Sequence, residues 1–281
     1  MMLHSYKLRL INMTDNYKQQ ITEFFNYRQQ YDNDFTYNRA IKLIHCVNLS
    51  EGETILDVAT GTAIVAIAAS KIIGIKGKVI GVDISPVMLA QAREKIIEAK
   101  INNIELIESD IDAIDFTDSN FDTIFCSSSV PWFTDIPGTF NNWYRWLKPK
   151  GKIVFSCYSE QSFLTPIIVQ LCQEICKIDL PDWNSITGTP AKCQQLLEAV
   201  GFNNIVVKQE QLGHYLTVEE AKNTFQSDRL WINPQGNPLL NLSDEDLAQL
   251  KLAYDAKIEQ LATAKGVWED ITIFYVSANK L

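Results

Sequence analysis

The sequence is poor in the residues that most readily form metal or redox centres. It has only three histidines in 281 residues, and its six cysteines include no Cys-x-x-Cys pair. Buried cysteine behaves as a small hydrophobic residue, so we interpret these cysteines as reduced thiols packed in the core. We therefore expect no metal site.

An excess of basic residues and a long apolar run are also missing. The formal net charge is −9, with acidic residues spread along the chain, which disfavours binding to nucleic acid or to an anionic membrane. No stretch approaches the roughly 18 consecutive apolar residues of a spanning helix, and the opening MMLHSYKLRL lacks the apolar core of a signal peptide. We expect a cytoplasmic protein that acts on a small molecule; the sequence makes no prediction of its oligomeric state.

Short β-branched runs alternate with helical patterns from residue 53 onward. This alternation is typical of an α/β fold, in which crossover helices connect the strands of a parallel sheet. Seven runs have the length and composition of strands: 53–58, 78–83, 103–109, 121–127, 152–158, 203–210 and 269–278. Between the second and third runs, Ser85 and Pro86 form an N-cap and a first-turn proline, which predicts a helix to about Lys100.

Two regions lie outside the alternation and divide the chain into expected segments. Residues 1–50 precede the first strand and are predicted to form a helical cap of two helices, and residues 51–211 form the core. Residues 212–266 are longer than a connector requires, so we interpret them as a helical lid insertion, with a structural ornament as the alternative. Residues 267–281 then supply the final strand of the core.

Capping patterns indicate two helices inside this insertion. Thr217 with Glu220 matches a capping box, and Ser243 is placed to begin a longer helix. The apolar face predicted for the longer helix comprises Leu247, Leu250, Tyr254, Ile258 and Leu261.

The stretch ILDVATGTAIVA, from Ile55 to Ala66, resembles a glycine-rich nucleotide loop with two glycines missing. A dinucleotide loop needs three glycines, but this one has only Gly61, with Ala59 and Ala63 beside it. Gly61 allows the backbone to approach a ligand closely. The N–H groups of the helix expected to start at Thr62 favour an anionic group such as a carboxylate.

Acidic residues end or follow each of the first three predicted strands: Asp57, Asp83 and Asp110. Ligands of open α/β sheets bind beyond the carboxyl ends of the strands, so we interpret the three together as a binding site. Asp83 follows Gly61 by 22 residues, where a carboxylate accepts hydrogen bonds from both hydroxyls of a ribose.

A base site is predicted beside this ribose site. Asp110 offers a carboxylate to the exocyclic amine of adenine, and Ile111 offers its backbone N–H to a ring nitrogen. Ile84 and Met88 are expected to supply the apolar walls.

Five motifs resemble, in order, those of the class I S-adenosylmethionine-dependent methyltransferases, in the subgroup similar to the ubiquinone/menaquinone C-methyltransferases. They are ILDVATGTA, GVDISPVMLAQAR, IESDID, FDTIFCSSSVPWFTD and NWYRWLKPKGKIVFSCY. The resemblance covers roughly residues 50 to 160 and implies a Rossmann-like sheet of seven strands, mostly parallel, with the last strand antiparallel. It implies S-adenosylmethionine as cofactor.

The resemblance also implies a role for individual positions. Asp83 would hold the ribose, and Asp110 and Ile111 the adenine. The residues that would surround the methionine part are Asp57, Ala59, Gly61, Thr62, Ser127 and Ser128. Two glycines of the family's Asp-x-Gly-x-Gly-x-Gly pattern are replaced, by Ala59 and Ala63, and we expect Ala59 to restrict the backbone of the loop.

Aromatic side chains are the main candidates for the wall of an acceptor pocket. They lie before the sheet, after the fourth strand and in the later connections: Tyr27, Tyr31, Phe35, Trp132, Phe133, Trp183 and Trp231. Core packing is the alternative for each of them. Trp132 and Phe133 are the best placed, because they directly follow the fourth strand.

The catalytic residues are not predicted by the sequence. Methyl transfer from a sulfonium requires alignment and exclusion of water, and a general base only where the acceptor must lose a proton. His214, at the start of the insertion, is a weak candidate for such a base, and His45 is expected to be structural.

We therefore expect a methyltransferase that acts on O, N or C of a small, partly apolar metabolite, in secondary metabolism or in quinone synthesis. An NAD(P)-dependent oxidoreductase is one alternative, although alanine methyls at positions 59 and 63 would crowd a pyrophosphate. A non-catalytic scaffold or adaptor that retains the fold is the other.

Overall fold

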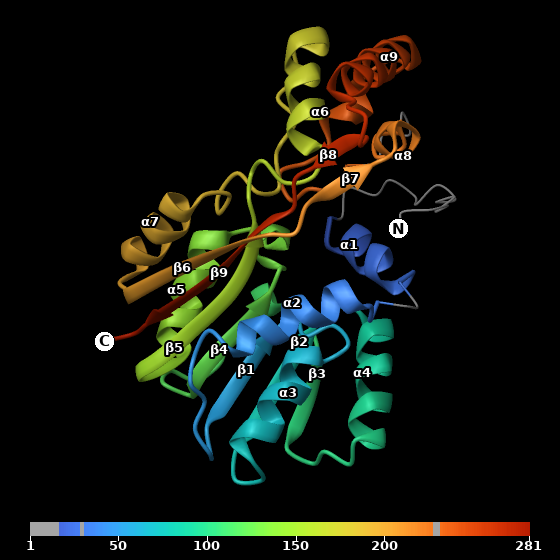
Figure 1. The fold of residues 1–281 in the computed structure, drawn as a ribbon. Coiled ribbons are helices and arrows are strands. Elements are labelled where there is room, and N and C mark those ends of the chain that lie inside the picture. Colours follow the sequence, from blue (N-terminus) through green and yellow to red (C-terminus); the bar gives the residue numbers. More distant parts are fainter. Residues whose placement is uncertain (1–16, 29–30, 227–230) are drawn as a thin grey trace. The chain divides into compact units, whose positions relative to one another are not determined.

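The computed structural model describes residues 17–28, 31–226 and 231–281, which separate into two compact units. We call the first the sheet unit; it comprises Ile21–Cys157, Thr189–Gln209 and Phe274–Leu281. We call the second the helical unit; it comprises Tyr158–Gly188 and Glu210–Ile273, together with residues 17–20. Figure 1 follows the chain through both by colour. No helix in the described ranges is long and apolar enough to cross a bilayer.

A seven-stranded sheet forms the centre of the sheet unit, with the order β3-β2-β1-β4-β5-β9-β6. Its strands are β1 (Thr54–Val58), β2 (Lys78–Asp83), β3 (Ile104–Glu108), β4 (Phe121–Ser127), β5 (Leu147–Tyr158), β6 (Asn203–Gln211) and β9 (Thr272–Asn279). All seven predicted strands are confirmed. The pairs β1–β2, β2–β3, β1–β4 and β4–β5 are parallel.

The last strand, β9, runs against its neighbour β5, as expected. The N–H of Ser159 donates to the Thr272 carbonyl at 2.8 Å, and the N–H of Lys280 donates to the Gly151 carbonyl at 2.9 Å. The start of β9 therefore meets the end of β5, and its end meets the beginning of β5, which is the antiparallel arrangement seen in Figure 1. The predicted α/β, Rossmann-like fold class is confirmed.

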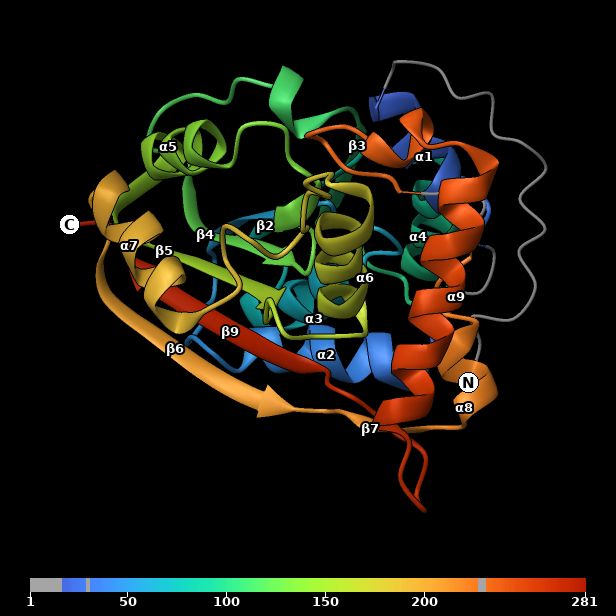
Figure 2. The same ribbon diagram turned by 90° about the horizontal axis from the view of Figure 1, so that it is seen from above.

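Helices cover both faces of this sheet. They include α2 (Asp34–Ile44), α3 (Ile64–Ile73), α4 (Pro86–Glu98), α5 (Ile136–Trp146) and α7 (Pro190–Val200); α1 (Tyr17–Asn26) precedes them in the chain. From β1, the chain adds β2 and then β3 on one side. It then returns to add β4 and β5 on the other side of β1. Right-handed crossovers therefore place α3 and α4 on one face and α5 and α7 on the other, as Figure 2 shows.

Local signals in the sequence account for the helix boundaries. The Ser85 hydroxyl accepts from the N–H of Met88 at 3.1 Å, and Pro86 occupies the first turn of α4, as predicted. The described part of the expected cap forms two helices, α1 and α2, also as predicted; residues 1–16 of that cap lie outside the described residues.

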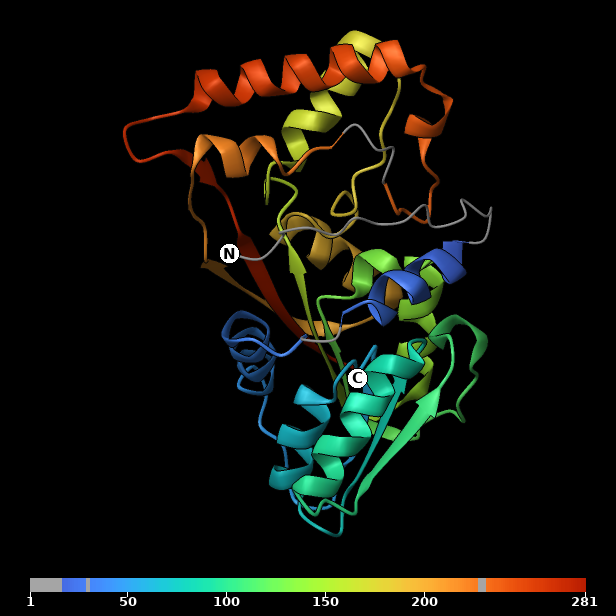
Figure 3. The ribbon, with the colours of Figure 1, turned by 90° about the vertical axis from the view of Figure 1, so that its right-hand side faces the viewer.

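The helical unit is built from two separate stretches of chain that share one apolar core. Its elements are α6 (Thr165–Leu171), a π-helical turn (Cys172–Cys176), β7 (His214–Leu216), α8 (Val218–Lys222), a 3-10 turn (Pro238–Asn241), α9 (Asp244–Leu261) and β8 (Val267–Glu269). Ile168 of α6 packs in one cluster with Leu250, Tyr254 and Ile258 of α9, the long helix of Figure 3. Tyr158–Gly188, which the sequence analysis counted with the core, therefore belongs to this unit.

Both capping patterns predicted for this region are present. Thr217 and Glu220 form a capping box at α8, and Ser243 forms one with Asp246 at α9. The predicted apolar face of α9 is correct except for Leu261, which is 43% exposed because it is the final residue of the helix. The two-stranded ribbon of β7 and β8 was not predicted, since three-residue strands are too short to show a period of two.

Two leucines of α9 test how far the core of the helical unit supports its stability. Leu250 is fully buried, whereas Leu252 on the same helix is 71% exposed. We expect Leu250→Ala to lower the free energy of unfolding by about 2–5 kcal/mol, because the lost contacts leave a cavity. Leu252→Ala should change it by less than about 0.5 kcal/mol. Urea unfolding followed by tryptophan fluorescence measures both; equal effects would contradict the assigned core.

Candidate functional site

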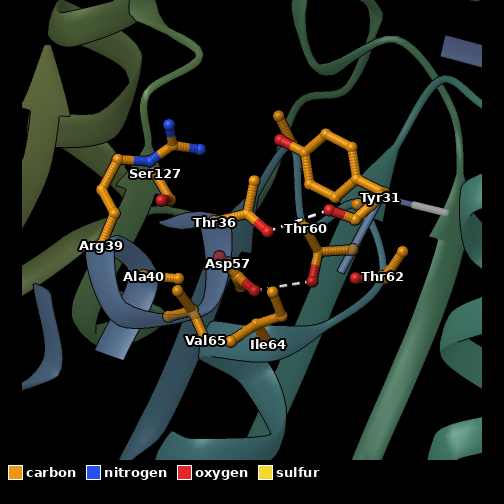
Figure 4. Close-up of a pocket in the computed structure, with 12 residues that line it drawn as sticks. Tyr31, Thr36, Arg39, Ala40, Asp57, Thr60, Thr62, Ile64, Val65 and Ser127 are labelled. Atoms are coloured by element: carbon orange, nitrogen blue, oxygen red, sulfur yellow. Dashed lines mark hydrogen bonds between the residues drawn. The ribbon is translucent and has the colours of Figure 1, made fainter. Parts of the chain in front are cut away.

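A pocket lies at the carboxyl end of β1, where the strand order reverses between β1 and β4. Open α/β sheets bind their ligands at such a reversal. The pocket is lined by α2, the segment before it, the loop after β1, the start of α3 and the end of β4: Tyr31, Thr36, Arg39, Ala40, Asp57, Ala59, Thr60, Gly61, Thr62, Ile64, Val65 and Ser127 (Figure 4). All of these residues belong to the sheet unit.

The loop after β1 has a left-handed backbone at Gly61 and at the two positions where alanine stands in place of glycine. Ala59, Gly61 and Ala63 have φ values of 53°, 55° and 62°, all in the left-handed region. The alanines at the two substituted positions thus adopt a conformation that glycine accepts without strain. The strain energy is about 1–2 kcal/mol for each alanine. Ala59 thus keeps a left-handed φ despite its side chain. The helix after it, α3, begins at Ile64, two residues later than expected.

Asp57 lies at the bottom of the pocket and is 1% exposed. Its Oδ2 accepts from the Thr60 hydroxyl at 2.6 Å and from the Ala66 N–H at 3.1 Å. Burial raises the pKa of Asp57 to about 7, although both hydrogen bonds lower it; the nearby Asp83 adds a smaller increase. Because burial disfavours the charged form, this carboxyl is poised to ionise when a cation enters the pocket.

Asp83 joins the loop to the start of α4. One carboxylate oxygen accepts from the Gly61 N–H at 2.7 Å and the other from the Ser85 N–H at 2.8 Å. Burial raises its pKa, and the backbone N–H groups of Ser85, Gly61 and Ile84 oppose that increase. Each carboxylate oxygen can accept more than one hydrogen bond, so Asp83 retains capacity for the two hydroxyls of a ribose.

The wall contributed by α2 was not predicted by the sequence analysis. Arg39 is only 7% exposed, and its guanidinium lies 5.2 Å from the centre of the Phe35 ring. Figure 4 shows its side chain extending towards Ser127, while Tyr31 and Thr62 lie at the opposite side of the pocket. A signal for Arg39 exists: it lies beside Ala40 and Leu43 on the buried face of an amphipathic helix, where arginine is rare unless paired.

The residues expected at the adenine side lie next to this pocket but do not line it. Asp110 is the N-cap of a 3-10 turn (Ile111–Ala113) and accepts from the Asp112 N–H at 3.1 Å. Ile111 and Met88 are buried, whereas Ile84 is half-buried directly after Asp83.

The two serines at the end of β4 have different environments. Ser127 lines the pocket. Ser128 has a φ of 56°, and its hydroxyl lies 3.0 Å from the Ser156 hydroxyl of β5. Ser128 is thus engaged with β5 and is, with Ala59 and Ala63, a third strained residue at this edge of the sheet.

The predicted aromatic wall is only partly assembled in the sheet unit. Trp132 packs against Phe24 and Phe25 of α1, with ring centres 6.3 and 6.1 Å away. Phe133 is buried in the core, 5.7 Å from Trp143, and does not line the pocket. Tyr27 is 61% exposed.

His214 and the two later tryptophans belong to the helical unit. His214 of β7 faces Glu269 of β8, with 3.7 Å between Nε2 and Oε2. Trp183 and Trp231 stack at 4.0 Å, and each indole donates to a backbone carbonyl. These contacts account for all three residues as parts of that unit's own structure.

Sequence comparison identifies the chain's relatives. The model of the ubiE/COQ5 methyltransferase family matches residues 31–199, a range that includes the whole lining of the pocket. The chain belongs to this family. The ubiquinone/menaquinone biosynthesis C-methyltransferase UbiE of Escherichia coli is 34% identical to it over 118 residues, or 42% of this chain. The chain spans only about half the length of that relative, since the match covers 47% of it.

Solved structures share the fold at low sequence identity. A phosphoethanolamine N-methyltransferase 2 of Haemonchus contortus aligns with a TM-score of 0.59 at 19% identity, over 95% of this chain and 60% of its own. The [4+2]-cyclase SpnF aligns with a TM-score of 0.56 at 15% identity, over 94% and 96% of the two chains. At such identities the likeness shows the fold alone.

The left-handed alanines predict a stabilising substitution. We expect Ala59→Gly to raise the free energy of unfolding by about 0.5–1 kcal/mol, since relief of strain outweighs the greater entropy of glycine in the unfolded chain. Ala69→Gly, in the interior of α3, should instead destabilise by about 1 kcal/mol or more. Urea denaturation of the three proteins decides the matter, and destabilisation by Ala59→Gly would contradict the strain.

The raised pKa of Asp57 predicts a pH dependence of stability. Its folded-state pKa of about 7 exceeds its value of 3.8 in the unfolded chain, so the folded state binds the proton more tightly. Proton binding by Asp57 therefore stabilises the folded state. This stabilisation is fully present below about pH 4 and is lost as pH rises through 7, and each unit of pKa difference corresponds to about 1.4 kcal/mol.

We expect Asp57→Asn to remove that contribution, so the free energy of unfolding should fall less between pH 5 and pH 8 in the variant than in the wild type. Denaturant titrations at the two pH values measure the difference. Parallel pH profiles would show that Asp57 ionises normally.

Proposed function

We propose that this protein is an S-adenosylmethionine-dependent methyltransferase that acts on a small, partly apolar metabolite in the cytoplasm. One observation carries the proposal: the pocket at the β1–β4 reversal sets the buried guanidinium of Arg39 against the oxygen atoms of Asp57, Thr60 and Thr62. An amino-acid zwitterion has the complementary pair of charges, a carboxylate and an ammonium. Family membership supports the same conclusion.

The methionine end of the cofactor is assigned to this pocket. The Arg39 guanidinium is the group for the carboxylate, since its planar fork matches a carboxylate in two hydrogen bonds. Asp57 and the threonine hydroxyls are the groups for the ammonium. A cation beside Asp57 favours the ionised carboxylate, so binding is accompanied by release of its proton near neutral pH.

The nucleoside end is assigned to the ends of β2 and β3. Asp83 accepts from the ribose hydroxyls, and its existing bonds to Gly61 and Ser85 hold it in place. Asp110 and the Ile111 N–H recognise adenine, with Ile84 and Met88 as the apolar walls. The roles of Asp83, Asp110 and Ile111 are those that the family resemblance implied.

The acceptor is assigned to the space beyond β4, beside Ser127, Tyr31 and Trp132. Methyl transfer is a direct displacement: the acceptor atom, O, N or C, forms a bond to the methyl carbon as the sulfur–methyl bond breaks, and S-adenosylhomocysteine leaves. The protein aligns the two reactants and excludes water. No described residue is assigned as a general base; His214 is engaged with Glu269 in the helical unit.

Relatives named for ubiquinone and menaquinone biosynthesis support a partly apolar acceptor, such as a quinone precursor. The aromatic side chains of Trp132, Phe24 and Phe25 agree with this polarity. We assign the helical unit, which lies largely outside the matched residues, to acceptor choice. We also propose a lid role for residues 212–266, which belong to this unit.

The alternatives fit the pocket less well. A pyrophosphate would meet the methyl group of Ala59 and the carboxyl of Asp57, both of which line the pocket, and this disfavours an NAD(P)-dependent oxidoreductase. SpnF, whose name describes a cyclase, shows that the fold by itself does not fix the chemistry. Binding measurements must therefore test the cofactor directly.

Calorimetry with S-adenosylhomocysteine tests the proposal. We expect Asp83→Asn to weaken binding at least tenfold, since the amide has one acceptor oxygen for a ribose instead of two. Asp122→Asn is the matched control: Asp122 also accepts from a backbone N–H, that of Thr54 at 2.8 Å, but at the opposite end of the sheet. Tight binding of NADH with no response to S-adenosylmethionine would refute the function, and unchanged affinity of Asp83→Asn would refute the ribose site.

A further inference from the structure

The segment between α1 and α2 places a carboxylate beside the pocket, outside its lining. Asp32 accepts a short hydrogen bond from the Thr62 hydroxyl through Oδ1, and its Oδ2 pairs with Lys95 Nζ of α4 at 2.5 Å. Thr62 is 1% exposed and lines the pocket, whereas the Asp32 side chain is 39% exposed. Asp32 thus reaches the ligand site only through Thr62.

Asp32 is held by a locally determined turn. The Asn33 side chain caps α2 by accepting from the Thr36 N–H at 3.0 Å, and the Thr36 hydroxyl donates to the Tyr31 carbonyl at 2.9 Å. These bonds fix the backbone on both sides of Asp32. Its carboxylate is therefore presented to Thr62 and Lys95 in one orientation.

This contact determines which way the Thr62 hydroxyl points. A threonine hydroxyl has one proton to donate and two lone pairs, and a carboxylate paired with a lysine is an acceptor only. Thr62 must therefore give its proton to Asp32. Its remaining lone pairs then offer the pocket an acceptor, which suits an ammonium and repels a carboxylate or a phosphate.

We propose that Asp32 is a positioning residue that orients the Thr62 hydroxyl to accept from the ammonium of the bound amino acid. This inference rests on the proposed function and deepens it. In this proposal, one side of the pocket binds the carboxylate, at Arg39, and the other binds the ammonium, at Thr62. The two residues lie on opposite sides of the pocket in Figure 4. The partial exposure of Asp32 screens its own charge, so its effect on the ligand passes through the hydroxyl.

Two ligands and a double-mutant cycle test the inference. S-Adenosylhomocysteine has the ammonium, whereas 5′-methylthioadenosine has the same nucleoside and thioether and lacks the amino-acid end. We expect Asp32→Ala and Thr62→Val each to weaken S-adenosylhomocysteine about tenfold and to change 5′-methylthioadenosine by less than about twofold. The double variant should bind within about twofold of the weaker single variant, because both changes remove one interaction.

Matched controls separate this role from a structural one. Thr62→Ser keeps the hydroxyl and should bind S-adenosylhomocysteine as the wild type does. Asp118→Ala, which also removes a carboxylate paired with a basic side chain, Arg145, should change neither ligand. Thermal melting of each variant shows whether it is folded.

The outcomes are distinct. Equal weakening of both ligands by Asp32→Ala, or multiplied effects in the double variant, would overturn the positioning role while leaving the cofactor assignment intact. A wild-type protein that binds neither ligand would refute the proposed function and this inference with it.

Discussion

Two carboxylates, the buried Asp57 and the half-buried Asp83, hold the loop on which the pocket depends. Asp57 accepts from Thr60 and from the first turn of α3, and Asp83 accepts from Gly61 and Ser85. The loop is thereby tied to the strand before it and to the neighbouring strand. The hydrogen bonds offset part of the cost of removing both acids from water, and the raised pKa values of both show that the offset is incomplete. A cation beside Asp57 would favour its ionised form.

Hydrogen bonds in the loop also hold the left-handed backbone at the alanines. A left-handed alanine persists only where the surroundings over-determine the backbone, and the hydrogen-bonded N–H groups of Gly61 and Ala66 lie on either side of Ala63. The protein therefore retains the shape of the loop at a cost in stability. The methyl group of Ala59 also occupies space in the pocket, where a glycine would leave more room for a bulky group such as a pyrophosphate.

The sequence predicts the sheet well because each strand is a β-branched run with polar ends, and the caps at Ser85 and Ser243 set helix starts by local chemistry. It predicts Asp57 and Asp83 because strand ends converge at one edge. It does not predict Arg39, since the position of α2 over that edge follows from tertiary packing, which no local pattern encodes. For the same reason, the sequence does not predict that Tyr158–Gly188 belongs to the helical unit.

The place of β9 in the sheet has a consequence for folding order. This strand is the last in the chain, yet it lies between β5 and β6. Until it is synthesised, β5 and β6 have no common neighbour, and the sheet is divided into a continuous block from β3 to β5 and an isolated strand. Completion of the sheet thus requires contacts that span more than 100 residues, which makes it a slow, late step. During synthesis, the ligand pocket, which lies wholly in the early block, is able to form before the domain that contains it is closed.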